Sequence, residues 1–144
     1  MKTVMKIDVE VPQARLAPLL ADPELSTKWM DDVDRVEPIS GLLGMQGSRY
    51  RLVPKPGGME FVATVVGREI PAELRVSLEG RIVTVAVTAR FAVISPTSTR
   101  LTHVQAFNFK GLFNRIGGLL ARGSIKQAQR RHLEAFKRYA ETGR

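Results

Sequence analysis

The sequence GLFNRIGGLLARGSIKQAQRRHLEAFKRYAETGR, residues 111–144, decides the fold of this chain. Its apolar residues recur at steps of three and four, which is the spacing of one helix face rather than the alternation of a strand. A helix gains little stability from intrinsic propensity alone, so most of it must come from packing an apolar face against the protein. We therefore expect an amphipathic C-terminal helix whose apolar side, including Leu120, Leu133 and Phe136, is buried.

Glycines divide this helical stretch. Gly117, Gly118 and Gly123 interrupt it, and each costs about 1 kcal/mol relative to alanine inside a helix. Ser124 followed by Gln127 has the form of a capping box, which marks a helix start. These signals predict a short helix near 112–122 and a main helix near 124–141 that ends at Thr142-Gly143. A single kinked helix is the alternative.

The residues before this stretch read mostly as strands. Met5, Ile7 and Val9 alternate with charged residues, which is typical of a strand with one buried and one solvent-exposed face. Asp22-Pro23 has the form of an N-cap followed by proline at the first helical position, so two short helices are expected, about 13–21 and 23–30. Six further strands are predicted, near residues 33–39, 49–53, 59–69, 74–79, 82–94 and 100–109. Segregated strands and helices joined by tight turns indicate an antiparallel sheet and an α+β fold.

Composition narrows the class of protein. A chain of 144 residues suits one domain, expected over 1–144. The absence of cysteine excludes disulfides and thiolate metal sites and favours a cytoplasmic location. The N-terminus carries charges inside its apolar run, so it does not read as a signal peptide. No stretch is apolar for long enough to span a membrane.

Positive charge is concentrated at the C-terminal end. The net charge is +8; residues 110–144 carry nine Lys or Arg against two Glu, and the other residues carry thirteen Lys or Arg against twelve Asp or Glu. Two interpretations remain open: a solvated helix face, or a surface for weak contact with an anionic membrane. Nucleic acid is not expected, because no recognisable module or interleaved aromatic residues accompany the charge.

The order of elements resembles a known group. The resemblance rests on the segments MKIDVEVP, LLADPELSTKW, VDRVEPISG, GSRYRLVP, GMEFVATVVGREIPAELRVSLEG, TSTRLTHVQAFNFKG and RRHLEAFKRYAETG. Together they resemble the SRPBCC or START-like proteins, which include polyketide cyclases/dehydrases, lipid-transport proteins and relatives of the birch-pollen allergen. The resemblance implies a helix-grip fold, in which a seven-stranded antiparallel sheet curves around the long C-terminal helix and two short helices follow the first strand. Pro18 departs from the pattern, since it falls where such proteins keep an unbroken helix.

A cavity between sheet and terminal helix is the expected site. If Leu101 faces inward, strand alternation places His103, Gln105 and Phe107 on the same side. The opposite orientation of this strand remains open, because the other side, which carries Thr102, Val104, Ala106 and Asn108, is also fairly apolar. His103 is the one candidate acid or base, since imidazole titrates near neutral pH. The expected ligand-binding residues are Trp29, Tyr50, Phe61, His103, Gln105, Phe107, Ile116 and Leu120.

Three functions are consistent with these features. The first is binding of a hydrophobic small molecule, lipid-like or polyketide-like. The second is a cofactor-free polyketide cyclase or dehydratase that uses His103 as acid or base. The third is an interaction protein that docks on an acidic surface through its basic C-terminal helix. A monomer and a homodimer are equally compatible with the sequence.

Cofactors and metals are not expected. The two histidines lie 29 positions apart, without the spacing of a zinc site. Asp31, Asp32 and Asp34 form an acidic turn that we interpret as solvated, because no histidine lies near it in the sequence. No serine sits in a nucleophile elbow.

Overall fold

A computed structural model describes all residues, 1–144. In chain order the elements are β1 (Lys2–Val9), α1 (Gln13–Ala21), η1 (Pro23–Lys28), β2 (Val33–Ser40), β3 (Arg49–Pro54), β4 (Phe61–Glu69), β5 (Glu73–Glu79), β6 (Val83–Ser95), β7 (Ser98–Phe109), α2 (Gly111–Leu120) and α3 (Arg122–Thr142). The predicted α+β helix-grip fold is confirmed.

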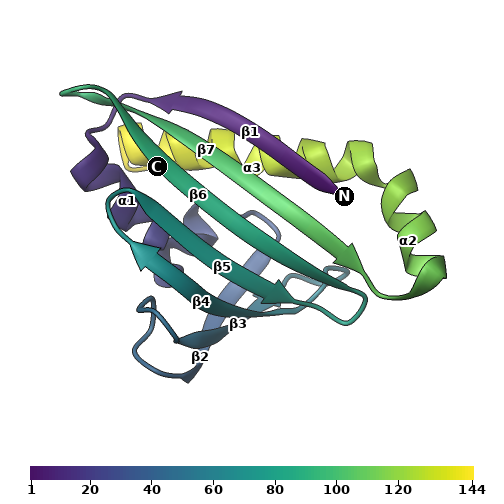
Figure 1. Ribbon diagram of the computed structural model, residues 1–144. Helices are drawn as coiled ribbons and strands as arrows, with labels where there is room; N and C mark the ends of the chain where they lie inside the picture. Colours follow the sequence, from purple (N-terminus) through teal and green to yellow (C-terminus); the bar gives the residue numbers. More distant parts are fainter.

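The seven strands form one antiparallel sheet in the order β1-β7-β6-β5-β4-β3-β2. Consecutive strands are neighbours from β2 to β7, whereas β1 lies at the opposite edge and pairs with β7 (Figure 1). Its register runs from Lys2 opposite Ala106 to Val9 opposite Thr99. The chain therefore brings its first strand beside its last.

The long helix α3 runs along one face of this sheet, and α1 lies at the other end of the molecule from α2 (Figure 1). Leu133 and Phe136 on α3 are fully buried and belong to one cluster with Val9, Leu16 and Leu101 from β1, α1 and β7. Burying such side chains contributes roughly 1.5–3 kcal/mol each relative to leaving them exposed. The sheet therefore holds α3 mainly through its C-terminal half.

Local sequence signals set most helix ends. The Asp22 carboxylate accepts a hydrogen bond from the Glu24 amide at 3.0 Å, which confirms the predicted cap before Pro23. The element that follows is a 3₁₀ helix that ends at Lys28, shorter than expected. Pro18 lies inside α1 without ending it. Gly143 ends α3 in the left-handed conformation with φ of 77°, as Thr142-Gly143 predicted.

The start of α3 differs from the prediction. Ala121 alone separates α2 from α3, and its amide still bonds the Gly117 carbonyl at 2.9 Å, so the break is a sharp bend between two helices. No side chain caps α3, and Ser124 lies inside its first turn, so the predicted capping box is wrong. The expected burial of the 112–122 face is also wrong: Ile116 and Leu120 are exposed. None of the helices is both long and apolar enough to cross a membrane.

Candidate functional site

An apolar pocket lies between the sheet and α3, and we call it the inner pocket. Its volume is about 90 Å³, and thirteen of its nineteen lining residues are hydrophobic. Its floor is made by inward-facing strand residues such as Val76, Leu78 and Val87, and its opposite side includes Leu133. A space of this size is several times what one water molecule needs.

A second pocket adjoins the first, and we call it the outer pocket. It has a volume of about 200 Å³ and is lined by Met59, Phe61 and Phe107 from the sheet side and by Ile125 and Ala128 from the first turns of α3. The residues common to both pockets are Met30, Leu52, Leu78, Gln105, Gln129 and His132. Because six residues line both, the two pockets form adjoining parts of one apolar space.

His103 and Gln129 form the polar centre of the inner pocket. The Gln129 amide nitrogen donates to the His103 carbonyl oxygen at 3.2 Å and to ring Nδ1 at 3.0 Å. Because Nδ1 accepts, the neutral ring carries its proton on Nε2. Burial, and secondarily the nearby His132, lowers the pKa of His103 from its usual 6.5 to about 4. At neutral pH His103 is therefore an uncharged hydrogen-bond donor through Nε2.

Other polar groups line the same space. Burial raises the pKa of Tyr50 to about 12, so its hydroxyl stays protonated. The Trp29 indole nitrogen is buried and has no protein partner. Gln105 accepts a hydrogen bond from the Thr3 hydroxyl at 3.2 Å through its side-chain oxygen, which leaves its amide nitrogen available. The pocket is thus apolar with a few donors, the pattern of small-molecule sites.

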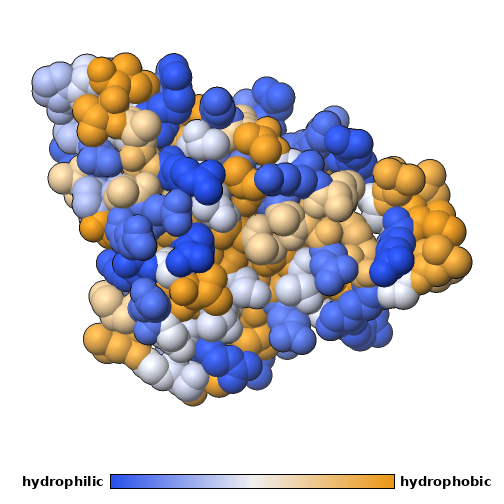
Figure 2. All heavy atoms as spheres, viewed as in Figure 1, coloured by the Kyte–Doolittle hydropathy of each residue, from blue (hydrophilic) through white to orange (hydrophobic).

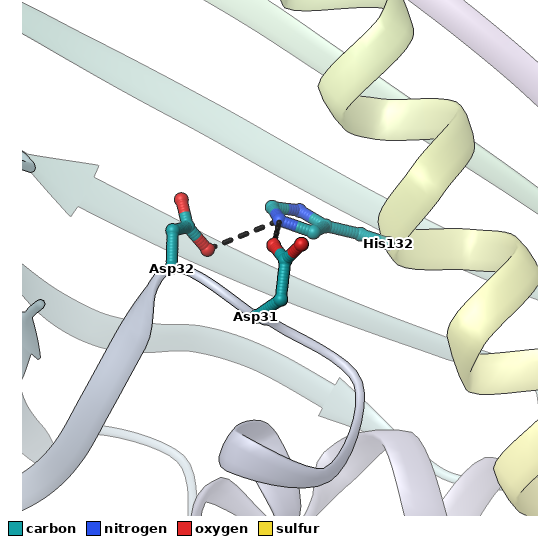
Figure 3. Close-up of side chains that lie close together, drawn as sticks. All are labelled: Asp31, Asp32 and His132. Carbon is teal, nitrogen blue, oxygen red and sulfur yellow. Dashed lines mark ion pairs between the residues drawn. The ribbon is translucent and has the colours of Figure 1, made fainter.

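His132 lines both pockets and belongs to a cluster of charged side chains with Asp31 and Asp32 (Figure 3). His132 Nε2 lies 3.0 Å from an Asp32 carboxylate oxygen and 3.5 Å from an Asp31 oxygen, and Arg131 pairs with Asp31 at 2.9 Å. Contact with His132 lowers the pKa of Asp32. The Asp32 oxygen is close to His132 Nε2 but does not meet it with hydrogen-bond geometry, so the contact is electrostatic, an ion pair when His132 is protonated. The cluster connects α3 to the turn before β2.

The same cluster corrects the interpretation of the acidic turn. The premise that no histidine lies near Asp31 and Asp32 is wrong, because α3 brings His132 beside them. Together the three residues offer ligand atoms within 4.8 Å of one another. Their contacts with one another and with Arg131 already account for this arrangement as an electrostatic link between elements.

The structure brings most of the expected site residues together. Trp29, Tyr50, His103 and Gln105 line the inner pocket, and Phe61 and Phe107 line the outer pocket. Ile116 and Leu120 do not line either pocket; both are on α2 and exposed. Their expected place in the cavity is wrong, because α3 covers the sheet and α2 turns away from it (Figure 1).

Two polar lining residues on α3 were missed from the sequence. From α3, Gln129 hydrogen-bonds His103, and His132 lines both pockets. A signal for them was present: Gln129 lies four residues before Leu133 and His132 lies four before Phe136, so both share the side of the helix that carries its buried apolar residues. Polar residues on such a side mark the place where a helix faces a cavity rather than a filled core.

Comparison with protein families gives one match over nearly the whole chain. The family described as "Polyketide cyclase / dehydrase and lipid transport" matches residues 1–141. No curated protein sequence gives a significant match.

Solved structures share the fold at low sequence identity. A START superfamily protein from Mycobacterium smegmatis superposes with a TM-score of 0.82 at 14% identity, covering 99% of each chain. A truncated norcoclaurine synthase from Thalictrum flavum has a TM-score of 0.74 at 14% identity, covering 99% of this chain and 94% of its own. The synthase in complex with dopamine and hydroxybenzaldehyde has a TM-score of 0.68 at 16% identity, over 95% and 85% of the two chains. At these identities the likeness concerns the fold.

Proposed function

Because this chain belongs to the polyketide cyclase/dehydrase and lipid-transport family, we propose that it binds a hydrophobic small molecule, lipid-like or polyketide-like, in the inner and outer pockets. The observation that carries the proposal is the apolar space between the sheet and α3, with uncharged donors on its wall. A filled core would instead bury these polar groups against protein partners, since an unsatisfied buried group costs about 1–3 kcal/mol.

The donors define the chemistry of the proposed ligand. Tyr50, His103 and Trp29 each present an O–H or N–H group that makes no hydrogen bond to a protein group, and none carries a charge at neutral pH. Such groups suit a ligand with carbonyl, hydroxyl or ether oxygens on a mainly apolar skeleton. A free carboxylate is a poorer fit, because no Lys or Arg lines the inner pocket.

A second candidate function is a cofactor-free cyclisation or dehydration. A pKa near 4 makes His103 a weak base at neutral pH, so in this reaction it would act as a donor that polarises a carbonyl. The norcoclaurine synthase complex, with two small aromatic molecules, supports a synthetic reaction within this fold. It does not bear on which residue would act here.

Native mass spectrometry of gently purified protein tests the binding proposal, with a retained small molecule as the expected result. Val87 on the pocket floor gives a matched variant: Val87→Phe fills the inner pocket and should weaken binding of the uncharged apolar probe N-phenyl-1-naphthylamine by roughly tenfold or more. Trp29 is the only tryptophan, so energy transfer from it reports probe binding at the pocket.

Val66→Phe is the control, because Val66 is on β4 but exposed. This variant should bind the probe as the unaltered protein does. Equal probe affinity in both variants, together with no retained molecule, would contradict the proposal. Turnover of an identified ligand that His103→Gln lowers by roughly 10²–10⁴-fold while binding is kept would favour the second candidate.

A further inference from the structure

The helix α2 carries an apolar face that the rest of the protein leaves uncovered. Phe113 is 89% exposed and Leu120 82% exposed, and three more large apolar side chains on this helix are more than half exposed. These five residues are Leu112, Phe113, Ile116, Leu119 and Leu120. Figure 2 shows hydrophobic surface gathered at the end of the molecule where α2 lies in Figure 1. Contiguous exposed apolar surface of this kind marks an interaction site.

The way α2 packs on the domain fixes the direction of this face. A Cβ added to Gly118 would lie 2.4 Å from the Phe109 ring, so the glycine sits directly on β7. At about 100° per residue, the five apolar residues span an arc of roughly 120°, and Gly118 lies on the opposite side of the helix. The close contact at Gly118 therefore turns the apolar arc outward.

Positive charge borders the apolar arc. Arg115 and Arg122 project along one edge of it, Lys126 follows one turn later, and all three are exposed and form no ion pair. Nearby pairs involve other residues, Lys110 with Glu79 and Arg131 with Asp31. Between Glu79 and Glu134 the chain contains no acidic residue at all. The surface around α2 is therefore both apolar and cationic.

We propose that α2 is a docking element for an anionic phospholipid bilayer, on which it lies parallel to the surface. Its apolar arc enters the boundary between headgroups and acyl chains, while Arg115 and Arg122 reach the phosphates from the edge of the arc, as in interfacial amphipathic helices. A second copy of this chain is a poorer occupant, because two such faces would bring like charges together. An anionic lipid surface complements both the charge and the apolar arc.

This assignment differs from the broad basic C-terminal surface expected from the sequence. Further along α3, Arg131 pairs with Asp31 and Lys137 bonds the Asp8 carbonyl, and both contacts hold α3 to the rest of the chain. Arg130 and Arg138 are exposed, but no large exposed apolar side chain accompanies them on α3. The free cations and the free apolar face occur together only at α2 and the first turns of α3.

The position of α2 also bears on ligand entry, a consequence that rests on the proposed function. The outer pocket is lined by Ile125 and Ala128, in the turns of α3 that directly follow α2. Docking through α2 therefore brings the outer pocket close to the bilayer. A lipid-like ligand would then pass between membrane and pocket with little exposure to water.

Vesicle co-flotation tests the docking proposal without any ligand. The protein should bind vesicles of equal parts phosphatidylcholine and phosphatidylglycerol, bind phosphatidylcholine alone much less, and lose binding as salt is raised. Phe113→Gln with Leu120→Gln should lower the affinity roughly tenfold or more. Arg115→Gln with Arg122→Gln should lower it by about fivefold for each charge removed.

Matched controls lie at the opposite end of the molecule. Val93→Gln with Ile94→Gln removes two exposed apolar residues at the β6–β7 turn, and Arg15→Gln with Lys28→Gln removes the same charge near α1 and η1. Both control pairs should keep vesicle binding. Equal losses in controls and α2 variants would overturn the proposal, as would a dimer in sedimentation equilibrium that Phe113→Gln with Leu120→Gln dissociates.

The two proposals fail separately. The Phe113→Gln, Leu120→Gln variant should keep the affinity for the uncharged probe N-phenyl-1-naphthylamine, because neither side chain lines a pocket. Loss of vesicle binding with an intact probe affinity supports docking through α2. Absence of vesicle binding in the unaltered protein at low salt overturns docking and leaves the small-molecule proposal standing.

Discussion

At the scale of single residues, His103 is a titratable side chain buried in a largely apolar pocket. Its imidazole is held neutral by burial, and its Nδ1 is occupied by Gln129. The inward position of His103 follows from strand alternation once Leu101 faces the core. Its partner does not, because Gln129 arrives from a helix 26 residues further along the chain. Periodicity identifies a face, but only packing decides which side chains meet.

The lowered pKa of His103 makes stability depend on pH. Between about pH 6.5 and pH 4 the unfolded chain binds a proton at this residue that the folded chain does not, so protonation favours unfolding. The free energy of unfolding should therefore fall as pH drops through this window, by up to about 3 kcal/mol. Above pH 6.5 the residue contributes no pH dependence.

Urea unfolding of the protein and of His103→Gln at several pH values measures this effect. The difference between the two proteins should change across the window and be constant above it. If the unfolding free energies of the two proteins change in parallel from pH 7 to pH 4, His103 titrates normally and is open to solvent. The lowered pKa of Asp32 makes the free energy of unfolding fall at more acidic pH, and this effect is the same in both proteins.

At the scale of elements, the two C-terminal helices have opposite roles. Phe136 on α3 is fully buried and packs edge-on against Trp29 with ring centroids 5.5 Å apart, whereas Phe113 on α2 faces outward. Phe136→Ala should lower the free energy of unfolding by about 3–5 kcal/mol, because it leaves a cavity in the core. Phe113→Ala should change it by no more than about 0.5 kcal/mol. Denaturant unfolding compares them; similar losses would show that α2 is packed against the core in solution.

The sequence predicted these helices with different success. The start of α2 and the end of α3 follow from apolar spacing and from Thr142-Gly143. The outward face of α2 could not be predicted, because a helical period shows which residues share a side and not whether the domain covers that side. The contact of Gly118 with Phe109 decides this, and it joins residues whose approach depends on the whole sheet. The capping box failed because helix formation continues almost unbroken through Ala121.

At the scale of the whole molecule, the strand pattern was the most informative part of the sequence. Alternating residues and turn signals predicted seven strands, and the antiparallel order from β2 to β7 follows their succession. The place of β1 beside β7 was not predicted, because β1 alternates in the same way as its neighbours and alternation does not show which strand it pairs with. The pockets depend on the curvature of the sheet and on how far α3 stands from it, which no local pattern encodes.

Placing β1 against β7 has a consequence for how each new chain matures. β1 finds its partner only after residues 98–109 have been synthesised, so it waits through the addition of about ninety residues, several seconds at about 5–20 residues per second. Its charged outward residues Lys2, Lys6 and Asp8 discourage pairing with other chains during that time. Because such distant pairing is slow to form, refolding from urea, followed by the fluorescence of Trp29, should take roughly milliseconds to seconds. Microsecond refolding would mean that pairing of β1 with β7 does not limit the rate of folding.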